Sequence, residues 1–248
     1  MDDWDPFKYP QMTPTVASLR RVKKDIASLL NDAPPGVLVH VDDGDITLLH
    51  AHIKGCSGTP YRGGYFYFVM KCPWDYPLQP PKVRLMTTGG GSVRFNPNFY
   101  ESGKVCLSIL GTWPGQCWIP TCSLESVLIS IQSVMCEKPL CNEPGFNEED
   151  SPDEVEEYNN CVKAQTLKVA VCGMLNNTSL NIPQPLVKQM EENFKKEFHF
   201  YEQLAIQYIE EGFDVIKVPL YKIVCRGESR QSLSRLRSIV KELRKKKL

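Results

Sequence analysis

The chain has 248 residues, of which 42% are hydrophobic and 23% are charged, as in an ordinary soluble globular protein. Lysine and arginine together number 29, and so do aspartate and glutamate, which makes the formal net charge zero. A neutral chain has no overall electrostatic attraction to nucleic acid or to a membrane surface, so neither is an expected partner.

Membrane and export segments are not apparent in the sequence. No stretch approaches the roughly 18 uninterrupted apolar residues of a membrane span. The acidic start, MDDWDPFKYP, lacks the basic and apolar regions of a signal peptide. We therefore expect a cytoplasmic and nuclear protein whose thiols stay reduced. The ten cysteines are scattered, so we expect mostly core packing, one nucleophile at most, and no disulfides.

The first predicted helix begins with Thr13 as its N-cap, followed by Pro14, and ends near Leu30. Apolar residues recur within it at steps of three and four, which predicts an amphipathic helix. They are Leu19, Val22, Ile26 and Leu29. The other face is basic, and from the pattern alone it is a solvated face. Its residues are Arg20, Arg21, Lys23 and Lys24.

Four β-rich segments follow, at residues 37–42, 46–54, 64–71 and 83–87. Their connections are short and contain no crossover helix, which predicts an antiparallel meander. Residues 88–122 show little periodicity and are rich in Gly, Pro, Asn and Trp. A loop of this length inside a compact domain is usually functional.

Helices dominate the rest of the chain. Ser123 is predicted to cap a second helix that ends near Pro139, and Ser151 opens a third through a capping box with Glu154 that runs to about Leu175. An apolar stripe predicts one long helix through 187–208, and a basic amphipathic helix comes last. We expect an α+β fold with an arm at 1–12, a core at 13–176 and a helical extension at 177–248.

Cys106 lies in GKVCLSIL, within the irregular region, and follows NPN at 96–98. A cysteine there is either a buried filler or a nucleophile held by an ordered loop, and the spacing alone supports both equally. A Cys–His protease is disfavoured because none of the four histidines lies in a signature near a cysteine. His50 and His52 share a strand face, which is either a metal-binding pair or, more often, a solvated face.

Four further cysteines have the pattern C-x4-C…C-x4-C: Cys117, Cys122, Cys136 and Cys141. Thiolates in such a pattern could bind zinc. However, Cys136 lies at the end of a predicted helix, and the characteristic C-x2-C spacing is absent. We expect packing and no metal site.

Several motifs in order resemble the ubiquitin-conjugating enzymes over roughly residues 13–175. The matching pieces are the basic first helix, PYRGGYFYF (60–68), PWDYPLQPPKV (73–83), NPN (96–98), GKVCLSIL (103–110) and Trp118. The chain departs from the family at Asn96, where a histidine that supports the loop is usual. An asparagine also donates and accepts hydrogen bonds, so the loop is expected to hold.

The resemblance implies the family core, with an N-terminal helix, a four-stranded meander and following helices. It also implies an enzyme that accepts ubiquitin or a ubiquitin-like modifier as a thioester on Cys106 and passes it to a substrate lysine. Asn98 corresponds to the family's catalytic asparagine, and Asn142 or Glu143 to a residue at the rim of the active site. No cofactor is implied, since ATP is used by the upstream activating enzyme.

Partner surfaces are implied in the same way. Positions on the first helix meet the activating enzyme, and two loops meet ubiquitin ligases. The helix positions are Arg20, Arg21 and Lys24, and the loop positions are Trp74, Trp118 and Pro120. The main alternative is an inactive binding module of the same fold, but such modules lack the cysteine that this chain retains. A nucleic-acid arm at the basic tail is disfavoured because the tail's apolar stripe requires burial and no aromatic residues interleave it.

Overall fold

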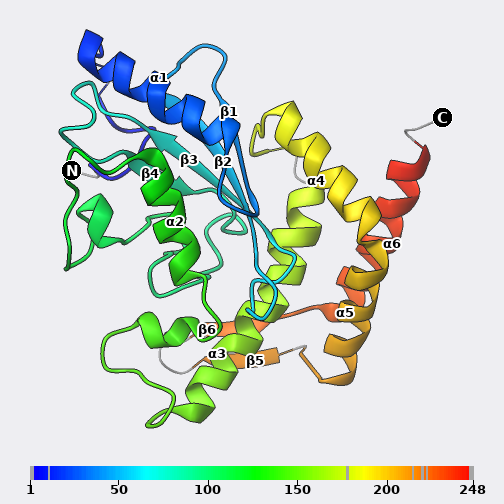
Figure 1. Ribbon diagram of the computed structural model, residues 1–248. Coiled ribbons are helices and arrows are strands. Elements are labelled where there is room, and N and C mark those ends of the chain that lie inside the picture. Colours follow the sequence, from blue (N-terminus) through cyan, green and yellow to red (C-terminus); the bar gives the residue numbers. More distant parts are fainter. Residues whose placement is uncertain are drawn as a thin grey trace. The chain divides into compact units, whose positions relative to one another are not determined.

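The computed structural model describes residues 3–10, 12–176, 179–213, 215–218, 221 and 223–245 (Figure 1). The chain forms two compact units. The first comprises Met1–Ile53, Phe66–Arg94 and Asn98–Val134, and the second comprises Lys54–Tyr65, Phe95–Pro97 and Met135–Leu248. The predicted boundaries of the arm, core and extension stay a prediction.

The first unit begins with helix α1 (Val16–Asn31). Its N-cap is Thr15, whose hydroxyl accepts a hydrogen bond from the amide of Ser18 at 3.0 Å. The predicted cap at Thr13 is therefore wrong by two residues. The reason is tertiary, since the amide of Thr15 donates to the carbonyl oxygen of Trp74 at 3.0 Å and fixes the chain at that point. Three of the four predicted apolar positions are buried: Val22, Ile26 and Leu29.

A four-stranded antiparallel sheet follows, in the order β1-β2-β3-β4. The strands are β1 (Val37–Val41), β2 (Leu48–Lys54), β3 (Tyr65–Lys71) and β4 (Lys82–Leu85). The predicted meander is confirmed. Consecutive strands pair directly, with Val39 opposite Ala51 and Val69 opposite Arg84.

Helix α2 (Leu124–Val134) completes the first unit. The hydroxyl of Ser123 accepts a hydrogen bond from the amide of Ser126 at 3.2 Å, which confirms the predicted cap. The helix ends before the predicted Pro139, which starts a separate 3₁₀ turn, η2 (Pro139–Asn142), in the second unit. The buried side chains of α2 include Leu124, Leu128 and Ile131.

The second unit contains α3 (Pro152–Gln165), which continues into a wider π-helix, η3 (Thr166–Gly173). Ser151 is the N-cap of α3, but its side chain makes no capping hydrogen bond, so the predicted capping box is wrong. Its carbonyl oxygen instead accepts from the amide of Val155 at 3.1 Å, so the backbone alone starts the helix.

Two helices, α4 (Gln184–Lys196) and α5 (Phe198–Glu210), replace the single helix predicted for 187–208. The break is at Glu197, where φ is −102° and ψ is 12°. The Glu197 carboxylate accepts from Lys54 Nζ at 2.6 and 2.7 Å. The apolar stripe continues across the break, because Phe194 packs edge-on against Phe198 with ring centroids 5.9 Å apart.

The helices after Asn176 pack against residues 54–65 of the same unit. The Tyr201 hydroxyl lies 2.9 Å from the carbonyl oxygen of Gly63 and 3.1 Å from the hydroxyl of Tyr65. Gly63 has a φ of +77°, and a Cβ atom there would lie 2.9 Å from the Tyr201 ring. A glycine is therefore required at this contact both by its backbone and by its neighbour.

The Val/Ile-rich segment near the end of the chain forms an antiparallel ribbon of β5 (Val215–Val218) and β6 (Ile223–Arg226). The last helix, α6 (Ser229–Lys245), packs beside α5 (Figure 1). The apolar residues Leu236, Ile239, Val240 and Leu243 of this amphipathic helix are buried. None of the helices in the described ranges is long and apolar enough to cross a membrane.

Candidate active site around Cys106

Cys106 follows a short hairpin that is attached to the sheet. The turn is closed by the amide of Tyr100, which donates to the carbonyl oxygen of Lys104 at 3.0 Å. Gly103, at the turn, has a φ of +88°, and a Cβ there would lie 2.5 Å from the carbonyl oxygen of Leu85. The amide of Leu85 donates to the Gly103 carbonyl at 2.9 Å, so the hairpin is held at the end of β4.

The structure brings together the two residues that the sequence predicts to be catalytic. The amide of Cys106 donates to the carbonyl oxygen of Asn98 at 2.8 Å. The side-chain nitrogen of Asn98 donates to the carbonyl oxygen of Cys106 at 2.6 Å. Both residues are buried, with Cys106 2% exposed and Asn98 4% exposed. Asn98 therefore supports the backbone of the reactive cysteine directly.

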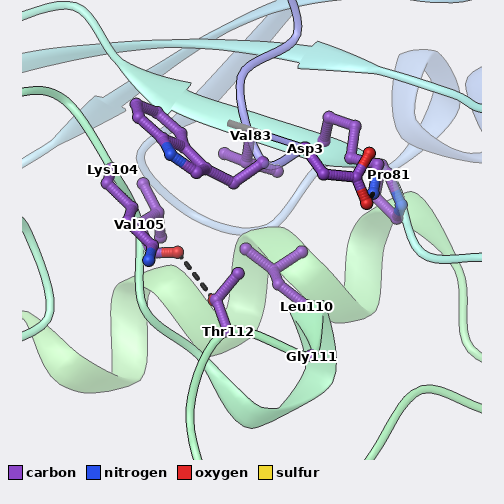
Figure 2. Close-up of a pocket in the computed structure, with 10 residues that line it drawn as sticks. Asp3, Pro81, Val83, Lys104, Val105, Leu110, Gly111 and Thr112 are labelled. Carbon is purple, nitrogen blue, oxygen red and sulfur yellow. Dashed lines mark hydrogen bonds and ion pairs between the residues drawn. The ribbon is translucent and has the colours of Figure 1, made fainter. Parts of the chain in front are cut away.

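Thr112 is a further supporting residue that the sequence analysis did not identify. Its hydroxyl accepts from the amide of Leu107 at 3.0 Å. The same hydroxyl donates to the carbonyl oxygen of Val105 at 2.8 Å (Figure 2). These two groups flank Cys106 on either side. Thr112 reaches them because the chain reverses after the 3₁₀ turn η1 (Ser108–Leu110), where Gly111 has a φ of 69°. Nothing in the local sequence pattern predicts this return.

A pocket of about 350 Å³ adjoins this segment (Figure 2). Lys104, Val105 and Thr112 line it together with Asp3 and Trp4 of the N-terminal arm. The arm is held on β4 by a buried carboxylate, because Asp5 accepts from Arg84 Nη1 at 2.6 Å and is 1% exposed. The backbone just before Cys106 is thus enclosed by β4 and the arm.

Burial raises the pKa of the Cys106 thiol, because a thiolate loses hydration there. Three neighbours act in the opposite direction: the charge of Lys104, a hydrogen bond with Tyr100, and the charge of Arg94. The Arg94 guanidinium lies over the Tyr100 ring, 4.4 Å from its centroid. The thiol is protonated at neutral pH, and the groups that favour the thiolate are already in place. Sequence reasoning identified neither Tyr100 nor Arg94.

Asn96, in the second unit, replaces the histidine that is usual in the family. It is fully buried, and its side-chain nitrogen donates to the Tyr61 hydroxyl at 2.7 Å. That hydroxyl in turn donates to the carbonyl oxygen of Phe95 at 2.7 Å. The asparagine supports its loop through hydrogen bonds, as expected from its donor and acceptor groups.

Asn142 and Glu143, the candidate rim residues, both have partners inside the second unit. The side-chain nitrogen of Asn142 lies 3.5 Å from Asn96 Oδ1, a long hydrogen bond. Glu143 Oε2 accepts from the Tyr221 hydroxyl at 2.6 Å. Their role at the rim of the active site stays a prediction.

The predicted partner positions of the first unit differ in accessibility. Arg20 and Lys24 are exposed on α1, whereas the guanidinium of Arg21 has acceptors within the unit. Trp118 is half-buried, and its Nε1 donates to the carbonyl oxygen of Pro77 at 2.7 Å. Trp74 is half-buried and Pro120 is exposed.

The histidine pair and the four cysteines were the candidate metal ligands. His50 and His52 are both buried, so a solvated face is the wrong interpretation. His50 Nδ1 lies 2.7 Å from the Tyr67 hydroxyl, and burial lowers the pKa of His52 to about 4. In the described ranges, no three His, Cys, Asp or Glu side chains gather as a metal site requires.

The four cysteines divide between the two units. Cys117 and Cys122 belong to the first unit, and Cys136 and Cys141 belong to the second. Cys117 and Cys141 are exposed, so the expectation of core packing is wrong for those two. The expectation that the four cysteines bind no zinc stays a prediction.

The family model of the ubiquitin-conjugating enzymes matches residues 21–166, which is more than half of the chain. The chain belongs to the ubiquitin-conjugating enzyme family. This finding confirms the resemblance, the fold class and the enzyme class that the sequence motifs predicted. The matched range contains the sheet, α1 from Arg21 onward, the Cys106 hairpin and α2.

Similar proteins give the same result. Ubiquitin-conjugating enzyme E2 Z of Danio rerio is 45% identical over 244 residues, which cover 98% of this chain and 73% of that protein. Ubiquitin-conjugating enzyme E2 Z of Homo sapiens is 53% identical over 184 residues, which cover 74% of this chain and 52% of that protein. The alignment with the human relative thus spans about half of that relative's length.

A much larger protein also contains a similar segment. The dual E2 ubiquitin-conjugating enzyme/E3 ubiquitin-protein ligase BIRC6 of Homo sapiens is 36% identical over 200 residues, which cover 75% of this ubiquitin-conjugating enzyme and 4% of BIRC6. The similarity therefore extends beyond the residues that the family model matches.

Proposed function

We propose that this ubiquitin-conjugating enzyme accepts ubiquitin or a ubiquitin-like modifier as a thioester on Cys106 and passes it to a substrate lysine. The observation that carries the proposal is the reciprocal hydrogen bonding of Cys106 and Asn98, at 2.8 and 2.6 Å. Any buried backbone group needs a hydrogen-bond partner, but here the partner is the asparagine that the family motif makes catalytic, which supports a reactive role for Cys106. Family membership supports the same reaction.

In the first step, the Cys106 thiolate attacks the thioester that joins the modifier to the activating enzyme. A new sulfur–carbonyl bond forms, and the activating enzyme's cysteine leaves as a thiolate that takes up the proton Cys106 has lost. One thioester replaces another, so the step needs positioning and thiolate formation more than driving force. Lys104, Arg94 and Tyr100 favour the thiolate against the cost of burial.

In the second step, a substrate lysine amine attacks the thioester carbonyl, the Cys106 sulfur leaves, and an isopeptide forms. The tetrahedral intermediate places negative charge on the former carbonyl oxygen. One well-placed amide donor stabilises such an oxyanion by about 3 kcal/mol. The Asn98 side-chain amide, which donates to the Cys106 carbonyl, is the proposed donor to the oxyanion.

The proposed partners follow from the same family role. The activating enzyme would meet exposed basic residues of α1, Arg20 and Lys24, and a ligase would meet the loops around Trp74 and Trp118–Pro120. ATP would be consumed by the activating enzyme, so this chain would need no cofactor. We place the activity in the cytoplasm and nucleus, on proteins and not on nucleic acid or membranes.

A charging assay tests the proposal. Purified activating enzymes, ATP and several ubiquitin-like modifiers are incubated with the protein, and gels are run with and without reductant. We expect a reductant-labile adduct with at least one modifier. Cys106→Ser should give a slower adduct that resists reductant, because an oxygen ester does not exchange with thiols.

Two results would refute the assignment. A reductant-labile adduct on Cys106→Ser would place the modifier on another cysteine. Modifier binding without any covalent adduct on the wild type, across all activating enzymes, would favour the inactive binding module.

A further inference from the structure

Arg21 of α1 directs its guanidinium to the loop that leads into α2. Nη1 donates to the carbonyl oxygen of Pro120 at 2.7 Å, and Nη2 donates to the carbonyl oxygen of Cys122. Nε donates to the Asp25 carboxylate, one helical turn further on, at 2.8 Å. Each of the three guanidinium nitrogens thus has an acceptor within the first unit.

Asp25 connects this arginine to two other parts of the first unit. Its carboxylate is buried, and it accepts from the Tyr76 hydroxyl and from the amide of Leu124, the first residue of α2, at 3.3 Å. A buried carboxylate without a cationic partner is strongly destabilising. Arg21 is that partner, and the Arg21 guanidinium also lies 5.7 Å from the centroid of the Tyr76 ring.

The loop at 118–122 is held on its inner side and exposed on its outer side. The hydrogen bond from Trp118 Nε1 to the carbonyl oxygen of Pro77 anchors the start of the loop. The Arg21 guanidinium anchors the backbone of Pro120 and Cys122. The Ile119 side chain, between the anchors, is 51% exposed. An exposed apolar side chain on a fixed backbone suits transient docking of a partner.

The neighbouring cations of α1 differ from Arg21. Arg20, Lys23 and Lys24 are exposed, whereas Arg21 is half-buried. Arg21, Lys24 and Glu125 all line a hollow of about 430 Å³ beside the loop. The difference is in bonding, because the Arg21 guanidinium is hydrogen-bonded to two loop carbonyls and to Asp25, whereas the side chains of Arg20, Lys23 and Lys24 are exposed.

We propose that Arg21 is a positioning residue for the loop at 118–122 and not a contact for the activating enzyme. The proposal rests on the proposed function, which makes this loop the ligase-facing surface. It separates Arg21 from Arg20 and Lys24, with which the family resemblance grouped it. A guanidinium is required because its planar fork reaches two carbonyls and a carboxylate at once, whereas a lysine ammonium is a single point charge.

Charge-conserving and charge-removing variants of the same residue distinguish the two roles. Arg21→Lys keeps the charge and loses the fork, and Arg21→Gln loses both. Amide hydrogen exchange of residues 118–123 and the KM for charging by the activating enzyme are measured in each. We expect both variants to accelerate exchange by about tenfold or more, a factor that corresponds to about 1.4 kcal/mol. The KM for loading by the activating enzyme should stay within about twofold of the wild-type value, since neither variant removes a cation that contacts the activating enzyme.

The matched controls are Arg20→Gln and Lys24→Gln, on the same helix. They should raise the charging KM and leave exchange of the loop unchanged. Normal exchange in Arg21→Lys would overturn the proposal. So would a higher charging KM in Arg21→Gln that Arg21→Lys restores, because that pattern identifies a docking charge.

A second comparison separates local positioning from general destabilisation. Tyr76→Phe removes one donor to Asp25 but leaves both loop carbonyls bonded to Arg21. When the two variants are compared at the same loss of thermal stability, Arg21→Lys should accelerate hydrogen exchange in the loop, whereas Tyr76→Phe should leave it unchanged. Equal acceleration in both would refute a specific role for Arg21.

A catalytic readout completes the test. With a RING-type ligase domain that stimulates wild-type discharge onto free lysine, Arg21→Lys should need about tenfold more ligase for half-maximal stimulation. An unchanged requirement would overturn the proposal. Failure of the wild type to form any reductant-labile adduct would refute the proposed function, while the exchange comparison would still decide the role of Arg21.

Discussion

The side-chain nitrogen of Asn98 donates to the carbonyl oxygen of Cys106 at 2.6 Å, and the backbone amide of Cys106 donates to the carbonyl oxygen of Asn98 at 2.8 Å. The catalytic asparagine of the family motif is thus part of the support of the cysteine backbone. Its loss would remove that support together with any donor to the reacting carbonyl. A test of its chemical role therefore needs a control that removes support alone.

Thr112 provides that control, because it also supports the backbone around Cys106 but presents no amide to the thioester. We expect Asn98→Ala to lose charging to about the extent that Thr112→Val does, because both remove support, but to discharge onto free lysine about 100- to 1,000-fold more slowly, since aminolysis relies more on an oxyanion donor. Thr112→Val should affect charging and discharge alike. Single-turnover charging and discharge, with melting curves, make the comparison. Equal losses in both half-reactions of Asn98→Ala would leave Asn98 as a structural residue only.

The reactivity of Cys106 should increase with pH beyond the range of an ordinary thiol. Burial raises the pKa of Cys106, so the thiolate fraction stays small at neutral pH and rises by about tenfold per pH unit until that raised pKa is reached. The rate of alkylation by iodoacetamide, followed at the Cys106 peptide by mass spectrometry, should therefore level off only above about pH 8.5, which is the pKa of an ordinary thiol.

Variants of Lys104 test the electrostatic contribution to the pKa of Cys106. Lys104→Gln removes a charge that favours the thiolate, so it should move the inflection to higher pH, whereas Lys104→Arg should leave it in place. An inflection below the ordinary thiol value in the wild type would show that the neighbouring cations outweigh burial, contrary to this prediction.

The docking of the extension can be tested at Gly63. Gly63→Ala places a methyl group 2.9 Å from the Tyr201 ring on a backbone with a φ of +77°. Gly58→Ala is the matched control, because its φ is +81° and nothing lies within 4 Å of the added carbon. Both variants carry left-handed strain of about 1–2 kcal/mol. Urea titrations should show a greater loss of unfolding free energy for Gly63→Ala, by at least about 1 kcal/mol.

Hydrogen exchange gives an independent measure of the same docking. Residues 187–208 carry the buried Phe194, Tyr201 and Tyr208, so their amides should exchange as slowly as those of α3. Rapid exchange throughout 187–208, or equal destabilisation by Gly63→Ala and Gly58→Ala, would mean that the helices after Asn176 are not held at Gly63.

The four cysteines at 117, 122, 136 and 141 are expected to bind no zinc. Cys117 and Cys141 are exposed, and Cys122 and Cys136 are half-buried. Metal analysis of protein purified without chelator should give far less than one zinc per chain. Stoichiometric zinc whose removal unfolds the protein would establish a structural site instead.

Periodicity and motifs determined much of this protein from the sequence alone. The spacing of Val22, Ile26 and Leu29 placed the buried face of α1, and β-rich segments with short connections predicted the antiparallel meander. The helix is readable because its burial repeats with the helical period, whereas β2 and β3 are buried almost throughout and are recognised by their β-rich composition and short connections. The motif GKVCLSIL, after NPN, pointed to Cys106 and Asn98 together.

Other features depended on the tertiary structure. The start of α1 is fixed by the hydrogen bond from the amide of Thr15 to the carbonyl oxygen of Trp74. The predicted long helix is interrupted at Glu197, whose carboxylate is bonded to Lys54. The family resemblance assigned Arg21 to a docking surface, but its acceptors at Pro120 and Cys122 lie far along the chain, with sequence separations of 99 and 101. A residue pattern encodes which side chains are buried. It does not encode which distant backbone group a buried polar side chain will meet, because that pairing exists only once the chain has folded.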